Sequence, residues 1–302
     1  MTVDTAAPAP VRPQEPGRRE VFQKRGRPVA RPLRRVAHYT LLVAVLILVI
    51  LPMAWMVITS LRGTGENIYG AASPLPQQPT LGAYQSVFDS LPIGTYILNT
   101  TVVEVLAITS ECLFSAFAGY ALSRKGWFGR RAALTIILVA LLIPFEAIMV
   151  SLFVIVNDIG LVDSLWGVWL PAFVTPVNVL IMRAAFMAIP DELEEAAVLD
   201  GANDWLRFWR VFLPSARGAV AVVAVTTFVA TWDNFLWPLL VLRSDTKYTL
   251  TLGLAQLSNS EFGYDERLVM AGATIAMIPV LVLFGFAQRY FFRGVGEGAL
   301  KM

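Results

Sequence analysis

Few residues of this chain have side chains that could catalyse a covalent reaction or hold a metal ion. The sequence has one histidine, His38, and one cysteine, Cys112, and neither has partners at the spacing of metal ligands. A single cysteine also excludes a disulfide within the chain. The phosphate-binding pattern GxxxxGK[ST] does not occur, so ATP hydrolysis would have to come from another polypeptide. We therefore expect no catalytic residues, no metal site and no cofactor.

The polar residues with the most informative spacing lie between two apolar stretches. Pro190 has the fixed φ that suits a helix start. Four acids follow it and place negative charge over the positive end of the helix dipole: Asp191, Glu192, Glu194 and Glu195. Gly201 can adopt the left-handed backbone that ends a helix, and Asn203 or Asp204 can cap the next one. The sequence predicts a helix-turn-helix at about 190–214.

An apolar stripe marks the second helix of this pair. Its aromatic members stand at i, i+3, i+4 and i+7: Trp205, Phe208, Trp209 and Phe212. Arg207 and Arg210 point away from the stripe. The stripe needs a lipid or a protein surface, and an amphipathic helix that rests on the bilayer is the alternative to a docking helix.

The spacing of this segment resembles the EAA loop of binding-protein-dependent ABC importers. That family's pattern is Glu-Ala-Ala, three residues, Gly, nine residues, Ile, any residue, Leu-Pro, and only Val211 in place of Ile departs from it. The resemblance implies a coupling helix that docks into a cleft of a cytoplasmic ATPase dimer and transmits its motion. It assigns ATPase coupling to Glu195, Ala196, Ala197, Asp200, Gly201, Leu213 and Pro214.

Composition predicts an integral membrane protein. Of the 302 residues 56% are hydrophobic and 15% are charged, with a mean hydropathy of +0.63. Three segments without Asp, Glu, Lys or Arg are long enough to cross about 30 Å of hydrocarbon: 36–61, 164–182 and 268–288. Three further apolar segments carry acids: about 97–122, 132–156 and 217–242. We expect an all-α bundle of six transmembrane helices, because only helices and closed barrels span a membrane and no barrel pattern is present.

The distribution of positive charge predicts the orientation. If both termini are cytoplasmic, 20 of the 24 Lys and Arg residues lie inside. Three regions follow: a disordered basic tail that touches lipid, a transmembrane permease domain in the cytoplasmic membrane, and a C-terminal cytoplasmic tail. They cover residues 1–35, 36–292 and 293–302. No aromatic or folded motif accompanies the basic tail, so nucleic-acid binding is not expected.

Ionisable residues inside the predicted spans are candidates for function because a bilayer makes them costly. Glu104 and Glu111 are seven residues apart and share a helix face with Ser115. They could form hydrogen bonds between helices or line a solute path. At about 10 Å apart by helical rise, they are too distant for the acid dyad of an intramembrane protease. Pro144 precedes Glu146 and is expected to kink the third span.

Two further segments resemble the sugar-transport branch of the same family, which includes the smaller permease of the maltose importer. One runs from Trp232 to Leu239 and the other is the glycine-rich C-terminus from Gln288. The first combines amide and carboxylate groups with flat rings, which suits sugars, although aromatic residues near a span end are also ordinary membrane anchors. The candidate pathway residues are Trp232, Asp233, Asn234 and Trp237.

The sequence therefore predicts the permease subunit of an ABC importer for a carbohydrate or related polyol, which is not itself an enzyme. The resemblance implies alternating access driven by the ATPase. It also implies two further partners, a second permease subunit and an extracytoplasmic solute-binding protein. The alternatives are a permease for a non-sugar solute and an ATP-independent channel or secondary transporter, and the coupling loop argues against the last two.

Overall fold

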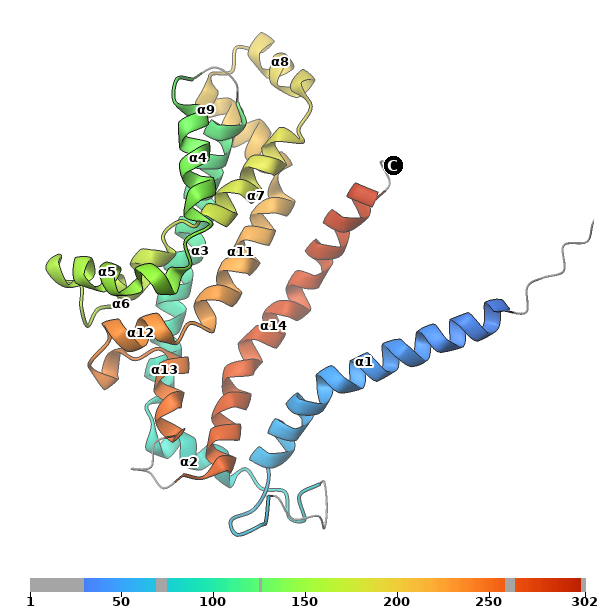
Figure 1. Cartoon of the computed structure of the whole chain (residues 1–302), viewed down its shortest axis with the longest axis vertical. Helices are drawn as coiled ribbons and strands as arrows, with labels where there is room; N and C mark the ends of the chain where they lie inside the picture. Colours follow the sequence, from blue (N-terminus) through green and yellow to red (C-terminus); the bar gives the residue numbers. More distant parts are fainter. Residues whose placement is uncertain (1–29, 69–74, 125–126, 259–263, 300–302) are drawn as a thin grey trace, which may run out of the picture. The chain divides into compact units, whose positions relative to one another are not determined.

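The computed structural model describes residues 30–68, 75–124, 127–258 and 264–299 (Figure 1). Every regular element in these ranges is helical, as the sequence predicts. The chain divides into two units, residues 1–51 and 52–302. The first unit holds the beginning of α1 (Ala30–Ser60). The predicted disordered tail lies almost wholly outside the described residues and stays a prediction.

The second unit is built around α3 (Ile93–Ser123). This helix packs against four others: α6 (Leu165–Trp169), α7 (Pro176–Met187), α11 (Arg217–Trp232) and α13 (Leu250–Ala255). The last long helix, α14 (Glu266–Ala299), packs against α2 (Gly82–Ser90), α11 and α13. The remaining α-helices are α4 (Arg130–Ala140), α5 (Phe145–Asp158), α8 (Asp191–Leu199), α9 (Asp204–Arg207), α10 (Leu213–Ser215) and α12 (Leu236–Val241). In this unit α8 and α9 lie at one end and α2 at the other (Figure 1).

Short segments of other helix types complete the unit. They are η1 (Leu170–Ala172), η2 (Phe208–Phe212), η3 (Asp245–Lys247) and η4 (Gln256–Ser258). Of these, η2 is a π-helical turn and the other three are 3₁₀ turns. The π-helical turn lies in the second half of the predicted helix-turn-helix, and such turns are frequent at functional sites.

Small residues allow α3 and α7 to approach closely. A Cβ atom added to Gly119 would lie 2.7 Å from the Cβ of Met182. Small residues at a helix contact are typical of membrane bundles, where close backbone approach replaces the hydrophobic driving force between helices. This close contact holds the end of α3 against α7.

Among the described residues, three helices are long and apolar enough to cross a membrane by themselves: Arg35–Ser60, Ile93–Ser123 and Glu266–Gln288. Three bent helix pairs are also long and apolar enough when the two helices of each pair are taken together. The count of spans rises to as many as six if each pair is one span. The predicted kink at Pro144 is a sharp break, with α4 and α5 inclined by 104°. This agrees with a proline that lacks an amide donor and cannot continue the preceding helix.

The predicted span 217–242 is not one continuous helix. α11 ends at Trp232, and α12 begins at Leu236 after a break of three residues. The segment 164–182 is also interrupted, since α6 with η1 meets α7 at 45°. At the C-terminus α14 runs through the predicted tail as far as Ala299, so the boundary at residue 293 is not marked by a helix end.

Candidate functional site

The predicted helix-turn-helix is present in the structure. Its first helix, α8, follows Pro190, which occupies the N-cap position with an extended ψ of 140°. Gly201 has φ of +78°, the left-handed conformation that L-residues with a Cβ atom rarely adopt. The side chain of Asn203 accepts a hydrogen bond from the amide of Leu206 at 2.8 Å and so caps α9. The turn chemistry expected from the sequence is confirmed at all three residues.

The aromatic stripe is divided between the core and the surface. Phe208 and Phe212 are buried in a cluster with Met182 and Phe186 of α7. Trp205 remains exposed and stacks on Phe117 of α3 at 5.8 Å between ring centroids. The protein's own bundle therefore supplies the apolar surface for half of the stripe. The second helix is anchored to α3 and α7 rather than held against the bundle by the bilayer alone.

The residues assigned to ATPase coupling lie mostly on the outside of this loop. Glu195, Ala196, Asp200, Gly201 and Pro214 are exposed. Ala197 and Leu213 are half-buried. Exposed apolar side chains adjoin them at Leu193, Val198 and Leu199. The first helix of the loop thus presents a surface with both apolar side chains and carboxylates.

A hollow of about 740 Å³ lies between α8 and the bundle. Ser123, Arg124 and Met187 line it from the ends of α3 and α7. On the other side it is lined by Asp191, Glu194, Glu195, Val198 and Leu199. No residue of α8 is fully buried. α8 therefore stands away from the bundle instead of packing tightly on it.

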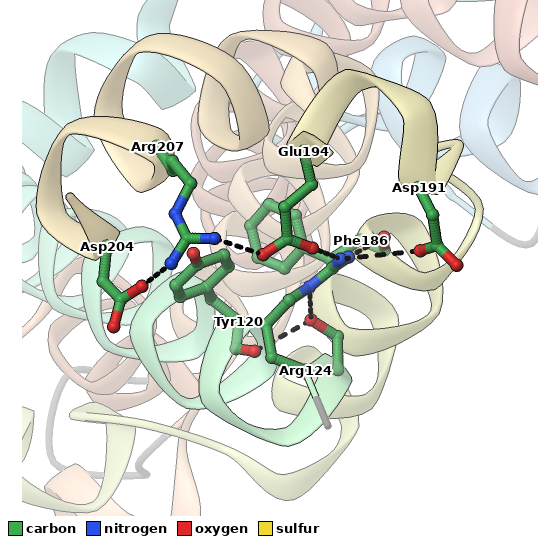
Figure 2. A network of polar contacts seen from close by, with 8 residues as sticks. Tyr120, Arg124, Phe186, Asp191, Glu194, Asp204 and Arg207 are labelled. Atoms are coloured by element: carbon green, nitrogen blue, oxygen red, sulfur yellow. Dashed lines mark hydrogen bonds and ion pairs between the residues drawn. The ribbon is translucent and has the colours of Figure 1, made fainter. Parts of the chain in front are cut away.

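Glu194 crosses this hollow as part of an ionic cluster that sequence reasoning did not find (Figure 2). Its two carboxylate oxygens accept from Arg124 at 2.6 Å and from Arg207 at 2.9 Å. Arg207 also pairs with Asp204. The only sequence signal was a set of acids in one helical turn with arginines elsewhere, and that signal names no pairs.

A second hollow, a cavity of about 400 Å³, lies among the helices of the bundle. Its polar lining comes from four helices or their ends: Glu111 of α3, Asn178 of α7, Thr226, Thr227 and Thr231 of α11, and Asn234 between α11 and α12. Phe145 and Trp237 supply aromatic surface. This mixture of hydrogen-bonding and aromatic groups in a concave site is typical of sites for small polar ligands.

Hydrogen bonds order the polar side of this cavity. Asn178 donates to Thr227 Oγ1 at 3.1 Å and accepts from the Thr226 hydroxyl at 3.1 Å. The Ser115 hydroxyl donates to Glu111 at 3.0 Å. Glu111 is therefore both a hydrogen-bonding residue and a lining residue. Sequence reasoning missed Asn178, although it is the only side-chain amide in the charge-free segment 164–182 and intramembrane amides commonly bond across helices.

The four candidate pathway residues do not gather at one site. Asn234 and Trp237 line the 400 Å³ cavity, whereas Trp232 and Asp233 line a separate hollow of about 490 Å³ beside α13 and α14. Trp237 is fully buried and donates from its indole nitrogen to the Gly167 carbonyl at 3.0 Å. Trp232 donates to the Ala276 carbonyl at 3.0 Å. Both tryptophans brace neighbouring helices, and Asn234 has the freer side chain of the cavity pair.

The remaining candidate chemistry is sparse. Glu104 is buried, and in the described part of the chain its carboxylate has no hydrogen-bond partner. Among the described residues no group of three His, Cys, Asp or Glu side chains could hold a metal ion. The thiol of Cys112 points to the Val220 carbonyl at 3.8 Å, a contact between α3 and α11.

An outer brace holds the connection between α5 and α6. Asp163, with φ of +56°, accepts hydrogen bonds from the amides of Arg243 and Ser244, and Lys247 pairs with it at 3.1 Å. The Ser244 hydroxyl also donates to Asp163, at 2.5 Å. This bond contributes most, and together with the others it holds the pKa of Asp163 well below its usual range. The brace ties α6, which lines the cavity with Val168, to the segment that follows α12.

Comparison with known proteins identifies what this arrangement resembles. Residues 112–297 match the family described as binding-protein-dependent transport system inner membrane component. The arabinooligosaccharides transport system permease protein AraQ of Halalkalibacterium halodurans is 32% identical, over 83% of this chain and 91% of its own length. The diacetylchitobiose uptake system permease protein NgcG of Streptomyces coelicolor is 31% identical, over 92% and 93%.

A solved structure extends the similarity to the fold. One chain of a bacterial ABC transporter involved in the import of the acidic polysaccharide alginate is 26% identical to this protein. The two superpose with a TM-score of 0.78, over 87% of this chain and 98% of the other. The similarity therefore extends over most of this chain and nearly the whole of the other.

Proposed function

We propose that this chain, which belongs to the family of binding-protein-dependent transport system inner membrane components, is a permease subunit of an ATP-driven importer for a carbohydrate or related polyol. The observation that carries the proposal is the exposed helix-turn-helix around Gly201, because a channel or a secondary transporter has no need of a docking element for an ATPase. ATP hydrolysis takes place in a separate ATPase dimer, and no bond is made or broken by this subunit.

The coupling residues act through their exposure. Glu195 is free to pair with a basic group in a cleft of the ATPase, while Leu199 is 88% exposed and offers apolar contact. Gly201 and Asn203 set the angle between α8 and α9, so they position these contacts without making them. Ala196, Ala197, Asp200, Leu213 and Pro214 complete the coupling set.

The chain offers a continuous path from the loop to the cavity. The segment Asp204–Ser215 meets α11 at an angle of 75°, and α11 then carries Thr226, Thr227 and Thr231 into the cavity. Movement of the loop when the ATPase dimer closes would therefore turn or shift a helix that lines the cavity. This supports alternating access, in which a central site opens to one side of the membrane at a time.

The class of solute rests on the cavity and on the relatives. The cavity joins amide, hydroxyl and carboxylate groups to the rings of Phe145 and Trp237, a combination that suits a molecule with many hydroxyl groups and apolar ring faces. The similar permeases named above serve arabinooligosaccharides and diacetylchitobiose. We assign the pathway to this cavity, with Asn234 as the contact residue and Trp237 as its supporting wall.

Three further partners complete the assembly. They are a second permease subunit, an extracytoplasmic solute-binding protein and the lipid of the cytoplasmic membrane. Both chain ends and the coupling loop lie in the cytoplasm, because this orientation puts most Lys and Arg residues inside. The orientation is tested with a reporter fused after Met302, which should be active only in the cytoplasm, and one placed near Gln77, active only outside. The reverse result would overturn it.

Reconstitution tests the function directly. The complex of this chain with its partner subunits is placed in proteoliposomes and given labelled oligosaccharide with or without ATP. We expect uptake that requires both ATP and the solute-binding protein. Uptake without ATP would indicate the channel or secondary transporter. ATP-driven uptake of amino acids or inorganic ions, but not of sugars, would indicate a permease for another solute.

A further inference from the structure

Arg124 occupies the junction of four elements at the cytoplasmic end of the bundle. It follows the last residue of α3, and its guanidinium donates to the Phe186 carbonyl near the end of α7 at 2.8 Å. The same group lies 4.2 Å from the ring centroid of Phe212 in η2 and donates to Glu194 of α8 at 2.6 Å. One planar cation at the end of α3 thus contacts α7 and both halves of the coupling loop. Figure 2 shows its bonds to Phe186 and Glu194.

Glu194 is held from two sides. One oxygen accepts from Arg124 and the other from Arg207 of α9, so each guanidinium has its own carboxylate oxygen. The side chain of Glu194 is 22% exposed, and each arginine is 18% exposed. Exposed ion pairs contribute little because water screens them, but this pair of contacts is largely shielded and linked in a network. By contrast, Asp191 is 76% exposed and lies 4.0 Å from Arg124.

α8 packs only loosely on the rest of the unit, through η2. No residue of α8 is fully buried, and the 740 Å³ hollow separates the helix from Ser123 and Met187. The contacts of Glu194 cross this hollow. The adjacent acid, Glu195, is exposed. Both carboxylates border the hollow, but Glu194 is ion-paired to Arg124 and Arg207, whereas Glu195 is exposed.

We propose that Arg124, Glu194 and Arg207 form a clamp that transmits displacement of α8 to α3 and α7. The inference rests on the proposed function, in which an ATPase moves the loop, and it gives Glu194 a role distinct from docking. Glu195 makes contact with the ATPase, whereas Glu194 and Arg124 are positioning residues that make the loop and the bundle move together. Loss of the clamp uncouples ATP hydrolysis from transport while the ATPase remains bound.

The test compares two acids of the same helix in the reconstituted complex. Glu194→Gln keeps the size of the side chain and removes its charge, and Glu192→Gln makes the same change at an exposed position of α8. Solute transported per ATP hydrolysed is measured beside co-purification of the ATPase. We expect Glu194→Gln to lower the ratio about tenfold, within the range typical of coupling between two sites, with ATPase association preserved. Glu192→Gln should leave both unchanged.

A double substitution checks that the charges act together. Glu194→Gln leaves the guanidinium groups of Arg124 and Arg207 facing each other without the carboxylate between them. Adding Arg207→Gln should lower the ratio little further, because Glu194→Gln has already broken the clamp to which both residues belong. Arg124→Lys, which keeps the charge but not the planar donor set, should give an intermediate ratio. If the losses of transport ratio in the two single variants, Glu194→Gln and Arg207→Gln, simply add in the double variant, the two residues do not belong to a shared network.

The outcomes separate this inference from the function on which it rests. A transport ratio in Glu194→Gln equal to that of Glu192→Gln overturns the clamp. Loss of ATPase association in Glu194→Gln also overturns it, since Glu194 would then belong to the docking surface. The coupling function itself is tested by Glu195→Lys. If this variant keeps both ATPase association and transport, the proposed coupling function fails as well. All ratios are expressed per complex assembled in the membrane, so reduced insertion does not affect them.

Discussion

The polar residues of the coupling loop are mostly exposed, whereas those of the membrane cavity are mostly buried or half-buried. In the loop Glu195 and Asp200 are exposed, whereas Glu194 bonds to Arg124 and Asp191 lies 4.0 Å from the same arginine. Around the cavity Glu111 and Asn178 are buried and already hydrogen-bonded within the chain. An outward group is available to a protein partner, and an inward group is available only to a solute that enters. Substitutions in the two regions should therefore alter different measurements.

The largest effect is expected at the wall of the cavity. Trp237→Ala removes a fully buried indole and its bond to Gly167, and loss of a buried tryptophan costs about 3–5 kcal/mol of folding free energy. We expect a clear drop in the unfolding temperature of the purified protein. Trp237→Phe keeps most of the ring and should lose far less. Equal stability of Trp237→Ala and wild type would show that the ring serves the solute alone.

The next effect concerns the turn of the coupling loop. A Cβ atom at Gly201 meets nothing within 4 Å, so substitution there tests backbone conformation and not a clash. The left-handed conformation costs an ordinary L-residue roughly 1–2 kcal/mol, and a β-branched residue fits it worst. Gly201→Val should lose most transport and part of the ATPase association in a pull-down. Gly201→Asn is the matched control, because Asn tolerates this conformation. Equal loss in both variants would contradict the argument.

These two residues also show what sequence can and cannot predict. Gly201 and Asn203 were identified because turn and cap chemistry depends on a few neighbouring residues. Trp237 was assigned to the pathway from its type and from the resemblance of its segment to sugar permeases, while its indole bonds to Gly167, 70 residues away. The Arg124–Glu194 pair has the same separation of 70 residues, and no local pattern specifies it.

The irregular points of the helices show the same difference between features that local sequence predicts and features that it does not. Pro144 predicts the bend between α4 and α5, because a residue without an amide hydrogen cannot continue the hydrogen bonding of the preceding helix. The π-helical turn at Phe208–Phe212 was not predicted. It changes the register of the aromatic stripe, so a stripe drawn for a regular α-helix assigns too many rings to one face.

A smaller effect is expected from adjacent residues that line different hollows. Asn234 reaches the 400 Å³ cavity, and Asp233 is exposed at the other hollow. Removing one hydrogen bond to a solute costs about 1 kcal/mol, so Asn234→Ala should raise the half-saturating solute concentration about fivefold without changing ATPase association. Asp233→Ala should leave transport kinetics unchanged. The opposite result would transfer the pathway to the hollow beside α14.

The smallest effect is a pH dependence at the outer brace. Because the pKa of Asp163 is lowered in the folded protein, its stabilisation is present above the unfolded pKa of about 3.9 and is lost as the pH falls below it. Asp163→Asn suits the left-handed backbone and removes only the charge. The variant should unfold at a lower temperature than wild type at pH 7, and the difference should shrink near pH 3. Asp158→Asn, at the exposed end of α5, is the control.

The central claim is that Glu195 of α8 docks an ATPase, and the dissociation constant between the purified ATPase and the membrane complex tests it most directly. Loss of one member of a desolvated charge pair costs roughly 2–5 kcal/mol, so Glu195→Lys should weaken binding at least about 30-fold. Glu192→Lys makes the same charge change on the same helix and should bind nearly as wild type. Wild-type affinity in Glu195→Lys would mean that this loop is a surface helix without a coupling role.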